Sequence, residues 1–483
     1  MTKLILIALF VGVIGGPSGC ARNPATGKRQ IMLVSESEEI AMGQQSDPQV
    51  RQEYGVVENQ ALQAYVQTMG RRLVAVSHRP NLEWHFTVVD SPVVNAFAIP
   101  GGYVYLTRGI LAYLGSEAEL AGVMGHEIGH VTARHSVRQI TRQQLAQLGI
   151  GVGSVLSPTF GQLGNAAEGG LGLLFLRFSR DDEREADRLG VEYASRGAYD
   201  PRQVSNFFDV LGRLSAANDR ETIPGWLSTH PDPPERVQAT RMLAMEWIQM
   251  LGLTEERMIL NRDQMLRAMD SVVFGNNPRE GFTEGNRFYH PALEFQIDIP
   301  PQWRVDNTRD AIVAIGPQQM AQLELTVPKV PAGTTVSDYV RVLAQRGMAP
   351  QSAENVTIDG NRAVLASYVM RTQAGPLAAL ACFIEYQNQI FQIVGITSDF
   401  RRFGSEIEQS IRSFERLTDQ RILRAQPDRL KIYTSQQGDT LSSIARRTNN
   451  PRVSADELAI LNRLAVDQPI AAGRLLKVVD PGY

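Results

Sequence analysis

One short motif, His-Glu-Ile-Gly-His at residues 126–130, constrains this chain more than any other part of its sequence. It lies in the run LAGVMGHEIGHVTARH, which predicts a helix that opens at Ser116 as N-cap. At 3.6 residues per turn, residues four apart differ by only about 40° around the axis, so His126 and His130 share one face. Glu127 is turned by about 100° from His126 and reaches the edge of that face. This arrangement predicts a zinc site in which the carboxylate acts as general base on the bound water.

A catalytic zinc ion needs a third protein ligand beside an open position. The segment FSRDDEREADRLG (178–190) offers Glu183 and Asp187, which are also four apart and share a face of a second helix. We expect Glu183 to bind the metal, one Zn²⁺ per chain, and Asp187 to hold a ligand imidazole by its other N–H. The alternative is an exposed helix laced with Arg–Glu pairs. His135 lies about 140° off the zinc face, which predicts a structural role or a bond to a zinc ligand.

Length, net charge and cysteine count exclude several classes of protein and of metal site. The chain has 483 residues, enough for about three domains at ~150 residues each. Its formal net charge of −3 lacks the basic excess of a nucleic-acid binder, so no nucleic-acid partner is expected. The two cysteines, Cys20 and Cys382, exclude a four-cysteine zinc site, so any metal must be held by His and carboxylate. Cys382 lies in an apolar run and is expected to be buried and inert.

The motif HEIGH, the later segment SRDDEREAD and the upstream run NAFAIPGGYVYLTRGIL resemble the CAAX-prenyl-protease-like zinc metalloendopeptidases, in particular their soluble periplasmic lipoprotein, or beta-barrel-assembly-enhancing, type. The resemblance covers roughly residues 25–245 and implies a mainly α, gluzincin-like protease domain with a small β-sheet, over 20–275. The ExxxD pattern of the family falls on Glu183 and Asp187, and Glu185 remains an alternative ligand. The resemblance also implies unfolded or misassembled envelope proteins as substrates.

The segment before the zinc helix reads as a strand, a Gly-Gly turn and a strand, within residues 86–105. A strand beside a zinc helix can offer its free edge to an extended peptide, which then pairs with it through its backbone. Asn95 and Ala98 are the candidate contacts for such a substrate strand. The alternative is a hairpin that serves only as scaffold.

His230 lies in GWLSTHPDPPERV, on a loop stiffened by Pro231 and followed by a helix with Asp232 as expected N-cap. The family carries a similar His-Pro segment after its zinc domain. We therefore expect His230 to fill the fourth zinc position in a resting state, as a latch, or alternatively to bond to nearby backbone. Arg236 is expected to pair with Asp187 and fix the loop to the second zinc helix.

Residues 1–19 resemble a bacterial lipoprotein signal, with an apolar run and then small residues before Cys20. This implies lipidation of Cys20 and a periplasmic protein held to a membrane by a lipid anchor. Since Ala21 rather than Asp follows, the outer membrane is the expected destination. An ordinary signal peptide with a chance cysteine is the alternative.

Two further domains follow. Alternating apolar residues over 285–418, with two helix-like stretches, predict a small α+β accessory domain. Residues 430–480, with the core GDTL-SIA, resemble a LysM module of the order β-α-α-β, whose family binds N-acetylglucosamine-containing glycans such as peptidoglycan. A LysM-like fold without a glycan groove is the alternative.

Together these features predict a zinc-dependent metalloendopeptidase of the bacterial cell envelope that acts in protein quality control. A peptidoglycan-anchored, zinc-stabilised chaperone or assembly adaptor with little proteolysis is the alternative. The presence of Glu127 argues against this adaptor, because a structural zinc site needs no general base. A cell-wall enzyme, suggested by the LysM-like module, is a third possibility.

Overall fold

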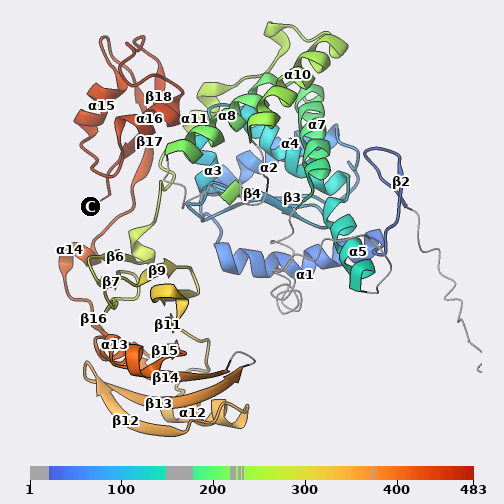
Figure 1. The fold of residues 1–483 in the computed structure, drawn as a ribbon. Helices are drawn as coiled ribbons and strands as arrows, with labels where there is room; N and C mark the ends of the chain where they lie inside the picture. Colours follow the sequence, from blue (N-terminus) through green and yellow to red (C-terminus); the bar gives the residue numbers. More distant parts are fainter. Residues whose placement is uncertain are drawn as a thin grey trace, which may run out of the picture. The chain divides into compact units, whose positions relative to one another are not determined.

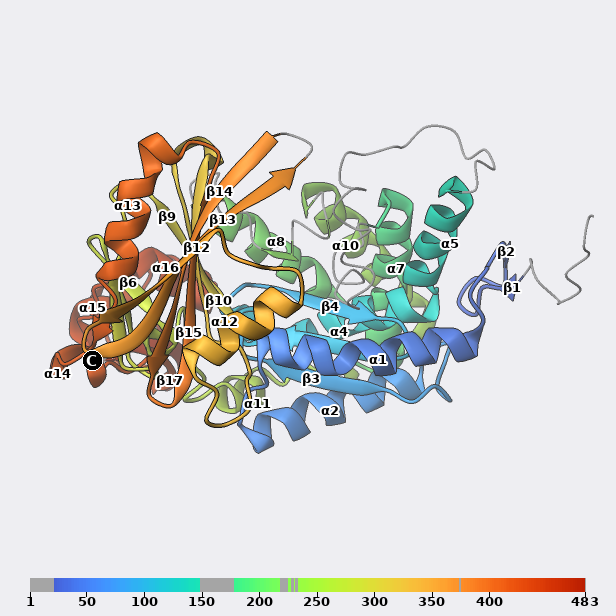
Figure 2. The same cartoon turned by 90° about the horizontal axis from the view of Figure 1, so that it is seen from below.

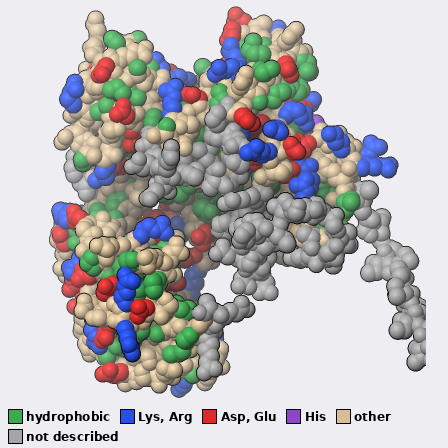
Figure 3. Space-filling model, viewed as in Figure 1, with side chains coloured by type: hydrophobic (Ala, Val, Ile, Leu, Met, Phe, Trp, Pro, Cys, Tyr) green, Lys and Arg blue, Asp and Glu red, His purple; other side chains and the backbone are tan. Residues whose placement is uncertain are grey.

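The computed structural model describes residues 21–147, 178–217, 225–226, 230, 233–372 and 375–482. The chain divides into two compact units, the first built mainly from residues 56–269 and the second mainly from 270–458. Among the described residues, no helix combines the length and the apolar character that crossing a membrane requires. On the face seen in Figure 3, basic and acidic side chains are interspersed on both units.

The first unit is mostly helical and surrounds a small sheet (Figures 1 and 2). Strands β3 (His85–Val89), β4 (Ala96–Ile99) and β5 (Tyr103–Thr107) take the order β3-β5-β4, with β3 parallel and β4 antiparallel to β5. A short pair, β1 (Ala21–Arg22) and β2 (Arg29–Gln30), precedes the helices. The helices are α1 (Glu36–Tyr54), α2 (Gln60–Ala75), α3 (Arg108–Tyr113), α4 (Glu117–Thr132), α5 (His135–Gln147), α7 (Arg180–Arg196), α8 (Arg202–Ala217), α10 (Pro233–Leu251), the 3-10 turn η2 (Glu255–Arg257) and α11 (Arg262–Ala268).

The sheet lies between α1 on one face and α2 with α4 on the other (Figure 1). Successive residues of a strand point to opposite faces, so Tyr105 and Val104 of β5 face different helices. Tyr105 donates a hydrogen bond to Asp47 of α1. Phe86 of β3, which pairs with Val104, packs closely against Gly70 of α2 on the other face. The Gly-Gly turn expected between β4 and β5 is confirmed, since Gly101 and Gly102 have φ of +83° and +93°.

The two helices that carry the predicted ligands, α4 and α7, pack with their backbones in close contact. A Cβ atom on Gly125 of α4 would lie 3.0 Å from the backbone oxygen of Gly190 of α7, and one on Gly129 would lie 3.2 Å from the oxygen of Ala186. Ser116 is the N-cap of α4, as expected, and accepts from the N–H of Glu119. Small residues on the shared faces therefore set how closely the ligand-bearing helices approach.

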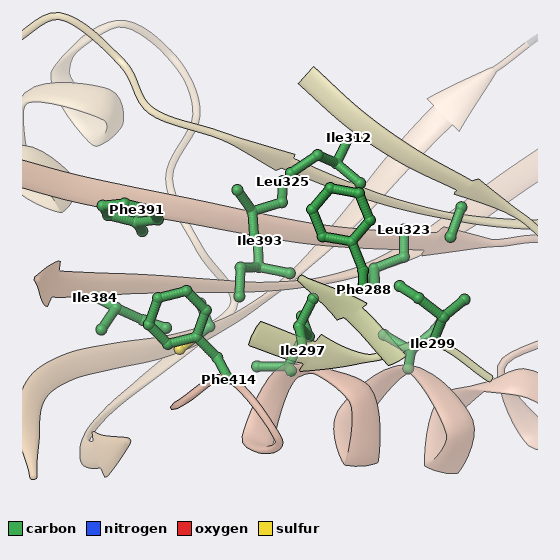
Figure 4. Packing of buried hydrophobic residues seen from close by; sticks show 14 of the residues in the cluster. Phe288, Ile297, Ile299, Ile312, Leu323, Leu325, Ile384, Phe391, Ile393 and Phe414 are labelled. Atoms are coloured by element: carbon green, nitrogen blue, oxygen red, sulfur yellow. The ribbon is translucent and has the colours of Figure 1, made fainter. Parts of the chain in front are cut away.

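The second unit contains a seven-stranded antiparallel sheet, β12-β13-β14-β15-β11-β10-β9, and a four-stranded sheet, β16-β8-β7-β6. Figure 4 shows how apolar residues of the two sheets pack together, among them Phe288, Ile297, Leu323 and Ile393. The elements are η3 (Pro278–Glu280), β6 (Phe282–Glu284), β7 (Arg287–His290), β8 (Phe295–Asp298), β9 (Arg304–Asn307), β10 (Ala311–Ile315), η4 (Pro317–Gln319), β11 (Ala321–Thr326), α12 (Val336–Gln345), β12 (Ser352–Ile358), β13 (Asn361–Thr372), β14 (Gly375–Tyr386), β15 (Gln389–Thr397), α13 (Phe400–Arg412), β16 (Glu415–Arg416) and α14 (Gln420–Leu423).

Two details of this unit concern its first residues and its cysteine. The segment 274–286, which precedes β7, contains η3 and β6, and Asn277 caps η3, which opens with proline. Cys382 in β14 is fully buried, which confirms the expected burial, and this burial raises the pKa of its thiol to about 12, which disfavours the reactive thiolate.

The C-terminal elements follow in the order β17 (Arg429–Thr434), α15 (Leu441–Thr448), α16 (Ala455–Asn462) and β18 (Leu475–Asp480). The two strands pair antiparallel. Thr440 caps α15, and Ser454 accepts from the N–H of Glu457 at the start of α16. Side-chain caps therefore fix where both short helices of this module begin.

Candidate metal centre

Four buried side chains meet where α4, α7 and the residues before α10 come together. They are His126 and His130 of α4, Glu183 of α7, and His230, and we call these four residues the metal group. One ligand atom from each lies within 4.8 Å of all the others, and no residue of the four is more than 3% exposed. The fold thus brings together the three residues predicted as ligands and the residue predicted as a fourth.

The distances within this group suit a tetrahedral ion. Nε2 of His126 lies 3.0 Å from Nε2 of His130 and 3.4 Å from Nδ1 of His230. The Glu183 carboxylate lies 3.6 Å from each of the two Nε2 atoms and 2.9 Å from Nδ1 of His230. Ligands bound at about 2.0–2.2 Å around tetrahedral zinc lie roughly 3.3–3.6 Å apart. The group therefore has close to the spacing that zinc requires.

The protonation of His126 also suits a metal ligand. Its Nδ1 lies 2.9 Å from Oδ1 of Asp187, which can only accept, so the hydrogen bond assigns the proton to Nδ1 and leaves the Nε2 lone pair free. Burial lowers the pKa of His126 to about 4 and that of His130 well below its usual value, which keeps both imidazoles neutral. Neutral imidazoles beside a carboxylate form a donor set that zinc prefers.

Arg236 of α10 fixes Asp187 in place. Its Nε and Nη2 donate to the two carboxylate oxygens at 2.8 and 2.6 Å, so the predicted pair between Arg236 and Asp187 is confirmed. Burial opposes ionisation of Asp187, but Arg236 and His126 outweigh it and hold the pKa of this carboxyl at about 2. The Arg236 guanidinium also lies 3.3 Å from Glu183 and packs on the ring of Phe208. One arginine therefore joins α10 to both acidic residues that α7 contributes to the site.

Glu127 lies beside the group but outside it. Its Oε1 is 3.7 Å from Nε2 of His230 and has no hydrogen-bond partner among the described residues. Burial, aided by the negative charge of Glu183, raises the pKa of Glu127 to about 7. A buried carboxylate with an unengaged oxygen next to a metal group is placed to accept a proton from water.

Ala98 and Asn95 lie at the edge of the sheet. Ala98 is half-buried in β4, which is the edge strand and packs against α4. Asn95 directly precedes β4, and its side-chain oxygen is buried without a hydrogen-bond partner in the described part of the chain. Trp226 donates its backbone N–H to Val94 at 2.9 Å, so Trp226 lies against the start of this edge.

Two aromatic contacts were not anticipated from the sequence. Phe178 stacks on the ring of His130 at 4.1 Å, and Trp226 stacks on that of His230 at 4.3 Å. His230 also donates its backbone N–H to the carbonyl oxygen of Trp226 at 2.7 Å. The signal available was an aromatic residue shortly before each motif, in FSRDD and GWLSTHP.

The alternative ligand and the other histidines of the described residues lie elsewhere. Glu185, the alternative ligand, is not part of the group, because its carboxylate bonds to His135. His78 bonds to the hydroxyl of Tyr193, while His85 and His290 have other neighbours away from the group. Cys20, Asp232 and the glycine-rich stretch 149–170 lie outside the described residues.

Comparison with known proteins agrees with this geometry. Residues 60–244 match the model of peptidase family M48, and residues 433–479 match that of the LysM domain. The beta-barrel assembly-enhancing protease of Yersinia pestis is 35% identical over 227 residues, 45% of this chain and 46% of that relative. Its namesake in Escherichia coli K12 is 31% identical over 259 residues, 51% of this chain and 52% of the relative.

A relative with a different name is the mitochondrial metalloendopeptidase OMA1 of Arabidopsis thaliana. It is 31% identical over 230 residues, 47% of this chain and 42% of that protein. The chain therefore spans about half the length of each of these relatives. All three are named as proteases or endopeptidases. The stretch that matches the family model contains His126, Glu127, His130 and Glu183. Residues 60–244 are thus similar to peptidase family M48 and residues 433–479 to the LysM domain, in agreement with the resemblance of the motifs.

Proposed function

We propose that this chain is a zinc-dependent endopeptidase. The observation that carries the proposal is the buried group of His126, His130 and Glu183, with Glu127 beside it and one oxygen of Glu127 unengaged. The proposal also gives residues 20–275 a gluzincin-like fold and residues 285–418 the role of an accessory α+β domain.

Each residue has a distinct role in this proposal. A zinc ion held by His126, His130 and Glu183 would polarise the scissile carbonyl and make water a better nucleophile. Glu127 accepts the proton of the attacking water and then gives it to the leaving amine. Asp187 keeps His126 in the tautomer that leaves Nε2 free. These steps need no group beyond the chain, the metal and water.

The substrate lies along the sheet edge. Because β4 is an edge strand beside α4, an extended peptide that adds to it would run past the metal group, with Asn95 and Ala98 as contacts. Such backbone pairing needs an unfolded segment and little side-chain specificity. It therefore suits unfolded or misassembled envelope proteins, and relatives named beta-barrel assembly-enhancing protease support this substrate class.

The rest of the chain would hold the protease in the envelope. The LysM domain would bind peptidoglycan, and a lipid on Cys20 would anchor the protein to the outer membrane from the periplasmic side. The alternative function, a zinc-stabilised adaptor with little proteolysis, has the same anchors. Casein digestion with and without a chelator separates the two, since the endopeptidase loses its activity with the metal and regains it with added zinc.

Cys20→Ala should move the protein from the membrane fraction to the soluble fraction, because the substitution removes the site of lipidation. Fractionation after a high-salt wash, with immunoblotting, measures the shift. Cys382→Ala is the matched control, because Cys382 is buried and should leave fractionation unchanged. A Cys20→Ala protein that still sediments with membranes would contradict the anchor and leave the LysM domain as the tether to test.

We also propose that His230 is a latch that occupies the fourth ligand position in the resting protein. Its Nδ1 lies 3.4 Å from Nε2 of His126, and it is held by Glu183 and by stacking on Trp226. Trp226, four residues before His230, donates its backbone N–H to Val94, next to the proposed substrate edge. A substrate strand would therefore have to displace Trp226 together with His230 before cleavage.

His230→Ala should raise basal casein cleavage at saturating zinc, about tenfold if nine tenths of the molecules are latched. Zinc affinity should fall slightly, because one ligand is lost. His78→Ala is the control, since His78 contacts Tyr193 outside the metal group. Equal cleavage by His230→Ala and the wild type, both fully zinc-loaded, would dispose of the latch.

A further inference from the structure

A second glutamate of α7 is connected to the metal group through a buried histidine. Nδ1 of His135, the first residue of α5, lies 2.9 Å from Nδ1 of His130. Nε2 of His135 lies 3.0 Å from the carboxylate of Glu185. His135 is fully buried, so both of its ring nitrogens are engaged within the protein.

The protons can be placed along this chain in only one consistent way. If His130 binds a metal through Nε2, as the proposed function requires, its proton must be on Nδ1. That N–H donates to Nδ1 of His135, which must therefore be unprotonated. The proton of His135 is then on Nε2 and donates to Glu185, which only accepts. Two neutral imidazoles and a carboxylate thus form a continuous hydrogen-bonded chain.

Glu185 is itself held by a basic residue on α5. Arg138 donates to Glu185 at 3.3 Å and also bonds to Asp182, one turn earlier on α7. Asp182 is fixed in turn by the capping box with Ser179 at the start of α7. His135 and Arg138 lie three residues apart on α5, so one face of α5 meets one face of α7. This contact orients the Glu185 carboxylate, which is the last acceptor of the hydrogen-bonded chain.

The two imidazole ligands are therefore supported differently. His126 donates directly to a carboxylate, Asp187, whereas His130 reaches its carboxylate, Glu185, through a second imidazole. We infer that His135 is a positioning residue that sets the tautomer and ring orientation of His130, and that Glu185 anchors His135 for this purpose. Both residues act on the metal through His130 and touch neither substrate nor metal.

The test measures zinc affinity by competition with a chromophoric chelator, using the full chain. His135→Phe fills the same space but cannot accept from His130, and should bind zinc about 10–100-fold more weakly. His135→Asn places an oxygen near the position of Nδ1 and should recover most of the loss. Glu185→Gln should fall between the wild type and His135→Phe. His78→Phe is the control, a histidine with a side-chain partner away from the metal group.

Cobalt substitution supplies a readout that a merely structural role would not move. The visible bands of bound Co²⁺ should differ from the wild type in His135→Phe and resemble it in His135→Asn, and the melting temperature of the metal-free proteins reports folding separately. Zinc affinity in His135→Phe equal to that of His78→Phe would overturn the inference while leaving the proposed function intact. If His135→Phe does not fold, the inference is overturned by wild-type affinity in Glu185→Gln. A wild-type chain that binds no zinc would overturn both.

Discussion

Glu127→Gln is expected to lower casein cleavage by about 10²–10⁴-fold, the usual contribution of a general base. The amide occupies the same buried space as the carboxylate but cannot accept the proton of the attacking water. Glu127 lies outside the group of four possible ligands, so zinc should remain near one per chain. Cleavage of labelled casein and elemental analysis of the same samples measure the two quantities.

Glu192→Gln is a suitable control for this variant. Glu192 is also a buried glutamate of the first unit, but its carboxylate pairs with Arg188 and Arg196 on the surface side of α7. It should retain wild-type cleavage. If Glu127→Gln keeps more than about a tenth of the wild-type rate with full zinc, Glu127 is not the general base.

The parts of the site that follow from helical periodicity could be predicted from the sequence. Residues at i and i+4 share a face wherever a helix forms, so the pairs His126–His130 and Glu183–Asp187 needed only the existence of two helices. The N-cap at Ser116 rests on an equally local rule.

Contacts between elements distant in the sequence could be predicted only in outline. The bond between His135 and Glu185 depends on the angle at which α5 crosses α7, and periodicity says nothing about that angle. His135 lies off the zinc face when α4 is extended as an ideal helix, yet α4 ends at Thr132, and Arg134 has φ of +56°. This break turns the chain so that the His135 ring returns to His130.

The capping of α4 was also predictable only in part. In a capping box at Ser116, the side chain of Glu119 would accept a hydrogen bond from the backbone N–H of Ser116. Its carboxylate instead accepts from the N–H of Gly115, one residue earlier. The start of the helix was therefore predictable, while the partner of a flexible side chain depended on the local path of the backbone.

Glu183→Ala is expected to lower zinc affinity at least 100-fold, beyond the roughly 10–100-fold loss typical of residues that only orient a ligand. The substitution removes the one carboxylate in the group of four, and with it the partner of His230. Chelator competition and zinc content per chain measure the loss. Casein cleavage should fall in parallel, because without the metal Glu127 has no activated water to deprotonate.

Glu185→Ala is the matched control, since the two glutamates are two residues apart on the same helix and carry the same charge. It should keep one zinc per chain and lose no more than the affinity expected of a residue that acts through His135. The opposite pattern, with zinc lost in Glu185→Ala and kept in Glu183→Ala, would make Glu185 the ligand. Residues two apart point about 200° apart around a helix, so only one of them can face α4 at the position of His126 and His130. The pair of variants therefore decides which face of α7 holds the metal.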